Sequence, residues 1–274
     1  MTEKDAEGGG ADPGDDDKLP FTAHLEELRT RLIKSGLAVL VGFFAAYGVN
    51  ERLYWFVTKP LREALPKGGH LGMFHPMEGF MTGLKVSLVA GILFALPILF
   101  FQAWKFVAPG LYAHEKRYVW PFVAAATAFF LLGASFAYWV VFPVAFKILF
   151  AYGGDSIMAL PSMESALDFP LKLLLSFGII FELPVAVFFL AKMGLVSHRT
   201  LSRNRGYSLV GILIVAAVLT PTGDPFNQLL MAAPLYVLYE ISIVVARVFG
   251  PKPGDDEGGH VEVEEAASPT DEQP

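Results

Sequence analysis

The chain has 274 residues, of which 54% are hydrophobic and 18% are charged, whereas about a quarter of the residues in an ordinary globular domain are charged. It contains no cysteine, which excludes disulfides, thiolate metal sites and cysteine nucleophiles. Residues 1–17 and 250–274 hold 15 of the 27 acidic residues, so the segment between them carries 19 basic against 12 acidic residues. This excess of positive charge suits an anionic bilayer surface and requires no nucleic-acid partner.

The two ends differ in composition from the rest of the chain. Both are rich in glycine, proline and acidic residues, which is typical of disordered segments. We therefore expect disordered acidic tails over 1–19 and 251–274, with a single transmembrane domain over 20–250.

Six apolar runs predict transmembrane helices, because a helix needs about 20 residues to cross about 30 Å of hydrocarbon. The predicted spans are 33–49, 79–104, 119–142, 166–193, 207–220 and 226–249. The third is expected to end before Pro143. The fifth is short, at about 14 residues or about 21 Å. Three explanations are open: the bilayer thins around it, neighbouring helices shield it, or the helix extends beyond the predicted ends. Two longer loops, 51–78 and 143–165, are large enough to cap one side of the bundle.

Lysine and arginine residues near the span ends predict the orientation. The N-terminal approach, the loops after the second and fourth spans, and the C-terminal exit hold 13 of them, against six in the opposite loops. Because cytoplasmic loops carry the excess of positive charge, both termini are expected in the cytoplasm.

The segment before the first span, 21–32, reads FTAHLEELRTRL. Its leucines recur at spacings of three and four, which is typical of an amphipathic helix at the membrane interface. Within it, Glu27 and Arg31 are spaced for an ordinary i,i+4 ion pair of a few tenths of a kcal/mol.

The loop after the second span reads FVAPGLYAHEKRYVWP from Phe106 to Pro121. It presents Glu115 on the cytoplasmic side, where an isolated acid usually forms a solvated ion pair of small value. If Glu115 and Glu27 lie on one face, they could instead bind two guanidinium groups through charge-assisted bonds.

Glu182 lies near the middle of the fourth span, where an acid costs about 2.5–3.5 kcal/mol on insertion scales. Such residues usually face a bundle interior or a wet cavity; the alternative is a protonated, structural hydrogen bond. Pro184 follows and frees a backbone carbonyl nearby. In the turn before the sixth span, Asp224 is expected to cap the helix that begins at Pro225.

Common catalytic patterns are missing. All six histidines fall outside the predicted spans, and there is no GxSxG, HExxH or phosphate-binding loop. An intramembrane hydrolase is therefore disfavoured, and no enzyme activity, metal or cofactor is expected. A proton-coupled small-molecule carrier using Glu182 is the alternative function, although the internal repeat typical of such carriers is absent.

Several segments together resemble the TatC family, the multispanning receptor subunit of the twin-arginine protein translocase. They are HLEELRTRL before the first span, Pro60 and Leu61 in the first outside loop, FVAPGLYAHEKR, VVFP, FELP, RNRGY, TPTGDPFNQ and PLYVLYE. Their order relative to six spans makes the resemblance specific over about residues 20–250.

The resemblance implies an all-α, concave, glove-like bundle of six helices. It implies that Glu27 and Glu115 bind twin-arginine signal peptides of folded precursors, with Phe106 packing on the peptide, and that Pro60 and Asp224 lie in functional loops. The doubled acid Glu26-Glu27 departs from the family pattern and leaves open which of the two contacts the peptide. Implied partners are the single-span subunits TatA and TatB in an oligomeric complex, and the implied energy source is the proton gradient.

Overall fold

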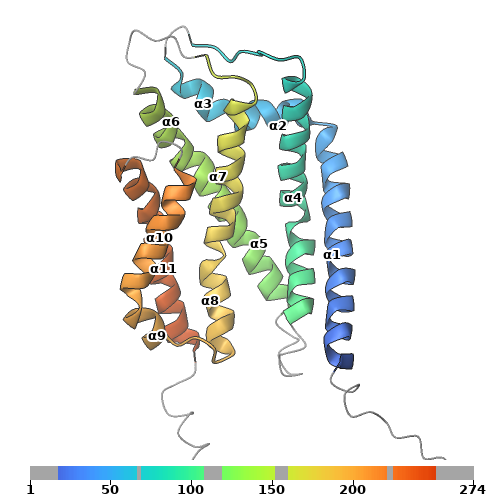
Figure 1. Ribbon diagram of the computed structural model, residues 1–274, viewed down its shortest axis with the longest axis vertical. Helices are drawn as coiled ribbons and strands as arrows, with labels where there is room; N and C mark the ends of the chain where they lie inside the picture. The colour runs from blue at the N-terminus through green and yellow to red at the C-terminus, as the bar shows by residue number, and fades with distance from the viewer. Residues whose placement is uncertain (1–17, 67–68, 108–118, 152–159, 221–224, 251–274) are drawn as a thin grey trace, which may run out of the picture. The chain divides into compact units, whose positions relative to one another are not determined.

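The computed structural model describes residues 18–66, 69–107, 119–151, 160–220 and 225–250 (Figure 1). Within these ranges the regular elements are helices. One isolated parallel β-bridge pairs Gly72 with Ser162. The helices are α1 (Lys18–Tyr47), α2 (Asn50–Val57), α3 (Lys59–Ala64), α4 (Glu78–Val107), α5 (Val119–Phe136), a π-helical turn (Ala137–Val141), α6 (Phe142–Ala151), α7 (Ser165–Phe181), α8 (Leu183–Lys192), α9 (His198–Arg203), α10 (Arg205–Leu219) and α11 (Pro225–Phe249).

Five helical stretches are long and apolar enough to cross a membrane. They are Leu25–Tyr47, Glu78–Phe106, Val119–Ala151, Ser165–Lys192 and Gln228–Phe249. The remaining expected span corresponds to α10, which is apolar but has 15 residues and is therefore about 22 Å long. A short fifth helix was expected, and α10 is short. It lies in the chain between α9, which ends at Arg203, and α11, which begins at Pro225.

Two sequence-based boundaries are wrong. Residues 21–32 do not form a separate interfacial helix but are the beginning of α1, because this stretch holds strong helix formers and no proline or glycine interrupts it. The helix of the third span does not end before Pro143 but continues to Ala151. The π-helical turn before Pro143 explains this, since Phe142 N–H donates to the Ala137 carbonyl five residues back. Such a turn accommodates the hydrogen bond that a proline removes.

The chain divides into two compact units, residues 1–53 with 83–127 and residues 54–82 with 128–274. In the first, α1 lies along α4. In the second, α11 lies beside α8 and α10, and α3 packs against α6. The second unit is held by fully buried aromatic and aliphatic side chains. The largest of them are Phe142, Phe146, Phe177, Leu167 and Leu173.

Glycines set the closest helix contacts of the second unit. A Cβ on Gly133 in α5 would collide with Phe177 and Phe181 of α7, and one on Gly178 in α7 would collide with the Phe130 ring. Small residues at a crossing let two helix backbones approach, which is the usual packing solution in membranes. The Glu182 region is therefore attached to a tightly packed helix pair.

Candidate functional site

An antiparallel contact between α1 and α4 organises the first unit. A Cβ on Gly42 would lie 2.6 Å from the Gly91 carbonyl oxygen, so only glycine fits at this crossing. A second contact lies eleven residues before Gly42 in α1 and eleven residues after Gly91 in α4. There, Arg31 Nη1 donates to Gln102 Oε1 at 3.4 Å. Just beyond the end of α1, eight residues after Gly42, the Asn50 side chain at the start of α2 lies against Gly83, eight residues before Gly91. One register therefore relates the two helices along their length.

This register brings Glu27 and Phe106 to the same level. Glu27 lies four residues before Arg31, and Phe106 lies four residues after Gln102, about 6 Å further along each helix. The side chains of both are half-buried. The beginning of α1 and the end of α4 thus place two of the three residues expected to contact a signal peptide at one end of one helix pair (Figure 1).

The third expected residue, Glu115, lies outside the described residues, in the connection 108–118 that follows α4 directly. Asp224 also lies outside them, so its expected capping role is untested. A meeting of Glu27 with Glu115 remains a prediction.

Glu27 is already paired with an arginine of its own chain. Arg31 Nη2 donates to Glu27 Oε1 at 2.9 Å, and the two side chains are 22% and 31% exposed. The other arm of the guanidinium reaches buried Gln102, while the buried Arg31 Nε has no hydrogen-bond partner among the described residues. The Glu27 carboxylate therefore already holds a guanidinium, in the i,i+4 ion pair that its spacing predicts.

Aromatic side chains surround this end of the helix pair, and sequence reasoning missed them. The Phe101 and Trp120 rings stack at 5.8 Å, Trp104 and Phe122 lie at 4.7 Å, and Lys105 Nζ sits 4.5 Å above Phe101. The spacing of Phe101, Trp104 and Lys105 along one helix was the available signal.

Glu182 separates α7 from α8, so the fourth expected span is formed by two consecutive helices. Its N–H donates to the Ile179 carbonyl at 3.1 Å, and Pro184 occupies the first turn of α8. Glu182 Oε1 is buried and has no hydrogen-bond partner in the described part of the chain. Since a buried carboxyl oxygen normally finds a partner, Glu182 Oε1 is an unsatisfied acceptor atom in the described part of the fourth span.

Pro60 is buried in the first turn of α3, next to Leu61, which is 3% exposed. Proline suits this position because the first helical residues have no carbonyl partner for an N–H. The helix it begins packs on α6, so Pro60 shapes the connection between the first two spans.

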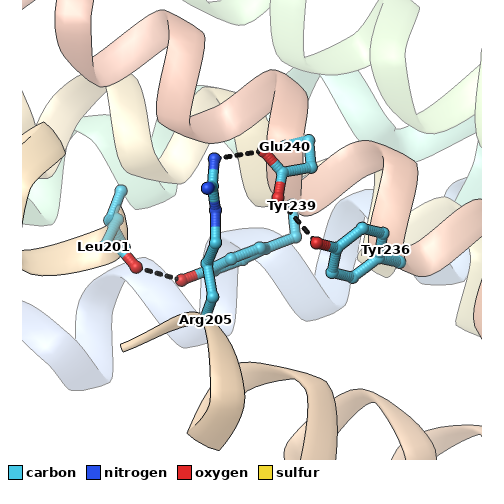
Figure 2. A network of polar contacts seen from close by, with 5 residues as sticks. All are labelled: Leu201, Arg205, Tyr236, Tyr239 and Glu240. Carbon is cyan, nitrogen blue, oxygen red and sulfur yellow. Dashed lines mark hydrogen bonds and ion pairs between the residues drawn. The ribbon is translucent and has the colours of Figure 1, made fainter. Parts of the chain in front are cut away.

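A further polar network joins α9, α10 and α11 (Figure 2). Arg205 Nη2 binds Glu240 Oε2 at 2.8 Å, the Tyr236 hydroxyl donates to Glu240 Oε1 at 2.8 Å, and the Tyr239 hydroxyl donates to the Leu201 carbonyl at 2.7 Å. Arg205 comes from the RNRGY segment, and Tyr236, Tyr239 and Glu240 come from PLYVLYE. The network holds the start of the short α10 against α11.

Among the described residues, no group of three His, Asp or Glu side chains could hold a metal ion. The polar groups gathered by the fold are paired or singly placed carboxylates, arginines and hydroxyls.

Residues 23–234 match the family model described as Sec-independent protein translocase protein (TatC). The chain is 47% identical to a protein of that name from Desulforapulum autotrophicum over 94% of this chain and 93% of the relative. It is 42% identical to one from Magnetococcus marinus over 84% of each. The crystal structure titled twin arginine translocase receptor TatC aligns with a TM-score of 0.73 and 36% identity, covering 82% of this chain and 98% of that one.

Proposed function

This chain belongs to the TatC family of Sec-independent protein translocase proteins, and we propose that it captures the signal peptides of folded precursors at Glu27, Glu115 and Phe106. It is a multi-pass protein of the bacterial inner membrane and a translocase component. The observation that carries the binding proposal is the α1–α4 register, which supports Glu27 and Phe106 acting at one level.

Recognition would begin at the Glu27 carboxylate. Its Oε1 accepts from Arg31, and its Oε2 makes no hydrogen bond with any described residue. An incoming guanidinium binds Oε2 or displaces Arg31, while Glu115 in the adjoining connection takes the second arginine. Phe106 and the aromatic residues near it offer an apolar surface for the peptide beyond its arginines.

The hydrophobic part of the signal peptide then enters between the spans towards Glu182. The unsatisfied Oε1 of Glu182 supports a role as a hydrogen-bonding position for a helix that arrives during transport. The side chain acts through its polarity in this proposal, and the chain itself makes no covalent bond.

We further propose a concave six-span bundle with α10 as the short fifth span and both termini in the cytoplasm. The lysine and arginine bias supports this orientation. The single-span subunits TatA and TatB would complete an oligomeric complex that uses the proton gradient. Pro60 would fix the first connection outside the membrane, and Asp224 would cap α11.

The test is the affinity of the purified protein for a twin-arginine peptide. Glu27→Ala and Glu115→Ala should each weaken binding about ten- to a hundredfold, because each loses a charge-assisted bond of about 1.5–3 kcal/mol. Glu26→Ala, one residue away on α1, is the matched control and should bind like the parent protein. Parental affinity in both variants would reject the assignment, and a loss in Glu26→Ala alone would move the site to Glu26.

A further inference from the structure

The segment α2–α3 has a buried and an exposed face. Tyr54 and Val57 are each 6% exposed, and burial raises the pKa of the Tyr54 hydroxyl. Trp55 and Phe56, by contrast, are 46% and 54% exposed. Two large aromatic side chains therefore stand on the outer face of a short helix.

Two cations share that outer face. Lys59 lies one turn after Trp55 with 55% of its side chain exposed, and its contact with Glu63 is long, at 3.8 Å. The Arg62 guanidinium lies 4.6 Å above the Trp55 ring, and its Nη2 donates to the Trp55 carbonyl at 2.9 Å. Stacking holds the guanidinium against the aromatic ring, and among the described residues it makes one hydrogen bond, although it has five N–H groups.

Contacts with a membrane-spanning helix fix the level of this face. The Phe56 ring stacks on Tyr138 at 4.6 Å, and the Tyr138 hydroxyl donates to the Phe56 carbonyl at 2.9 Å. Tyr138 belongs to the apolar stretch Val119–Ala151, and the next residue, Trp139, is 67% exposed. The helix α2 is therefore attached to the side of this span next to Tyr138 and Trp139, where an aromatic side chain of the span is exposed on the protein surface.

We propose that the lipid-facing patch of Trp55, Phe56, Lys59 and Arg62 lies in the headgroup layer of the bilayer and binds the phosphate of an anionic phospholipid. Aromatic rings with cations on one short helix are the composition of an interfacial helix. A guanidinium and an ammonium on the same face match a phosphate in charge and geometry. The bilayer is the occupant because the patch lies against a span.

The depth of the patch is measured first. The chain has no cysteine, so a nitroxide on Trp55→Cys of the reconstituted full-length protein is unique. Its collisions with oxygen should exceed those with a water-soluble nickel chelate. A nitroxide on His70→Cys, an exposed position away from the patch, should show the reverse. An aqueous profile at position 55 would overturn the proposal and favour a soluble protein as the occupant.

Lipid specificity is measured next by native mass spectrometry of retained phosphatidylglycerol against phosphatidylcholine. Each cation near an anionic surface contributes about fivefold to binding, so Lys59→Gln/Arg62→Gln should lose up to about 25-fold of the phosphatidylglycerol retention. Lys147→Gln/Lys172→Gln, with the same charge change elsewhere in the unit, should retain the parental level. Equal losses in both variants would overturn a specific patch. Neither measurement requires a signal peptide.

Discussion

Replacing Arg31 by glutamine is expected to tighten the binding of a twin-arginine peptide. Arg31 occupies Glu27 Oε1 at 2.9 Å, so it competes with a ligand guanidinium for the same carboxylate. Its second contact, to Gln102 at 3.4 Å, is at the long end for a hydrogen bond. Glutamine is two bonds shorter and loses this contact, but the Gly42–Gly91 crossing does not involve Arg31, so the α1–α4 packing should persist.

The size of the effect follows from the exposure of the pair. With side chains 22% and 31% exposed and an i,i+4 spacing, the ion pair contributes about 0.3–1 kcal/mol. Removing the competitor should therefore raise the affinity about two- to fivefold. Since the pair is partly solvated, the gain should shrink as salt is raised.

The assay is a titration of the purified protein with a labelled twin-arginine peptide at low and at high salt. Lys34→Gln, an exposed cation on the same helix, controls for the general loss of positive charge. Weaker binding in Arg31→Gln than in Lys34→Gln would refute the competition argument and make Arg31 part of the receptor.

Three further outcomes are expected. Glu182→Gln should keep much of the export of a folded reporter, and Glu182→Leu should lose more, because an amide still donates and accepts hydrogen bonds; full export by the leucine variant would leave Glu182 with a structural role. Gly91→Leu should destabilise the protein by about 1–3 kcal/mol in thermal denaturation, because even a Cβ there would lie 2.6 Å from a backbone nitrogen of α1. Gly36→Leu is the control and should not destabilise it, since a Cβ at position 36 would have no neighbouring atom within 4 Å. Reporter fusions after Pro66 should read as periplasmic and after Arg203 as cytoplasmic; the opposite pattern would reject the orientation.

Much of the helical layout could be predicted from the sequence because lipid requires long apolar runs. The short α10 followed from the polar residues on either side. The division of the fourth span at Glu182 was not predicted, although the proline two residues later was the available signal. Helix ends were harder. Pro143 normally marks a boundary, but a π-helical turn before it lets the helix continue, and no local pattern in the sequence announces such a turn.

The candidate site could be predicted by residue type but not by pairing. The HLEELRTRL segment pointed to Glu27, yet its Arg31 bridge to Gln102 joins residues 71 positions apart and depends on two glycines at a crossing. The network of Arg205, Glu240 and Tyr236 was missed for the same reason, since periodicity gives a face within one helix but not its partner on another.

The central claim is that Glu27 and Glu115 receive the two arginines of a signal peptide. A photo-crosslinking residue beside the two arginines of a precursor, and the same residue in a twin-lysine version of it, test this most directly with the full-length protein in membranes. The twin-arginine precursor should crosslink to the segments around Glu27 and Glu115, and these crosslinks should disappear with the twin-lysine version, because lysine lacks the bidentate fork of arginine. Absence of crosslinks to both segments, or equal crosslinks from both precursors, would contradict the claim.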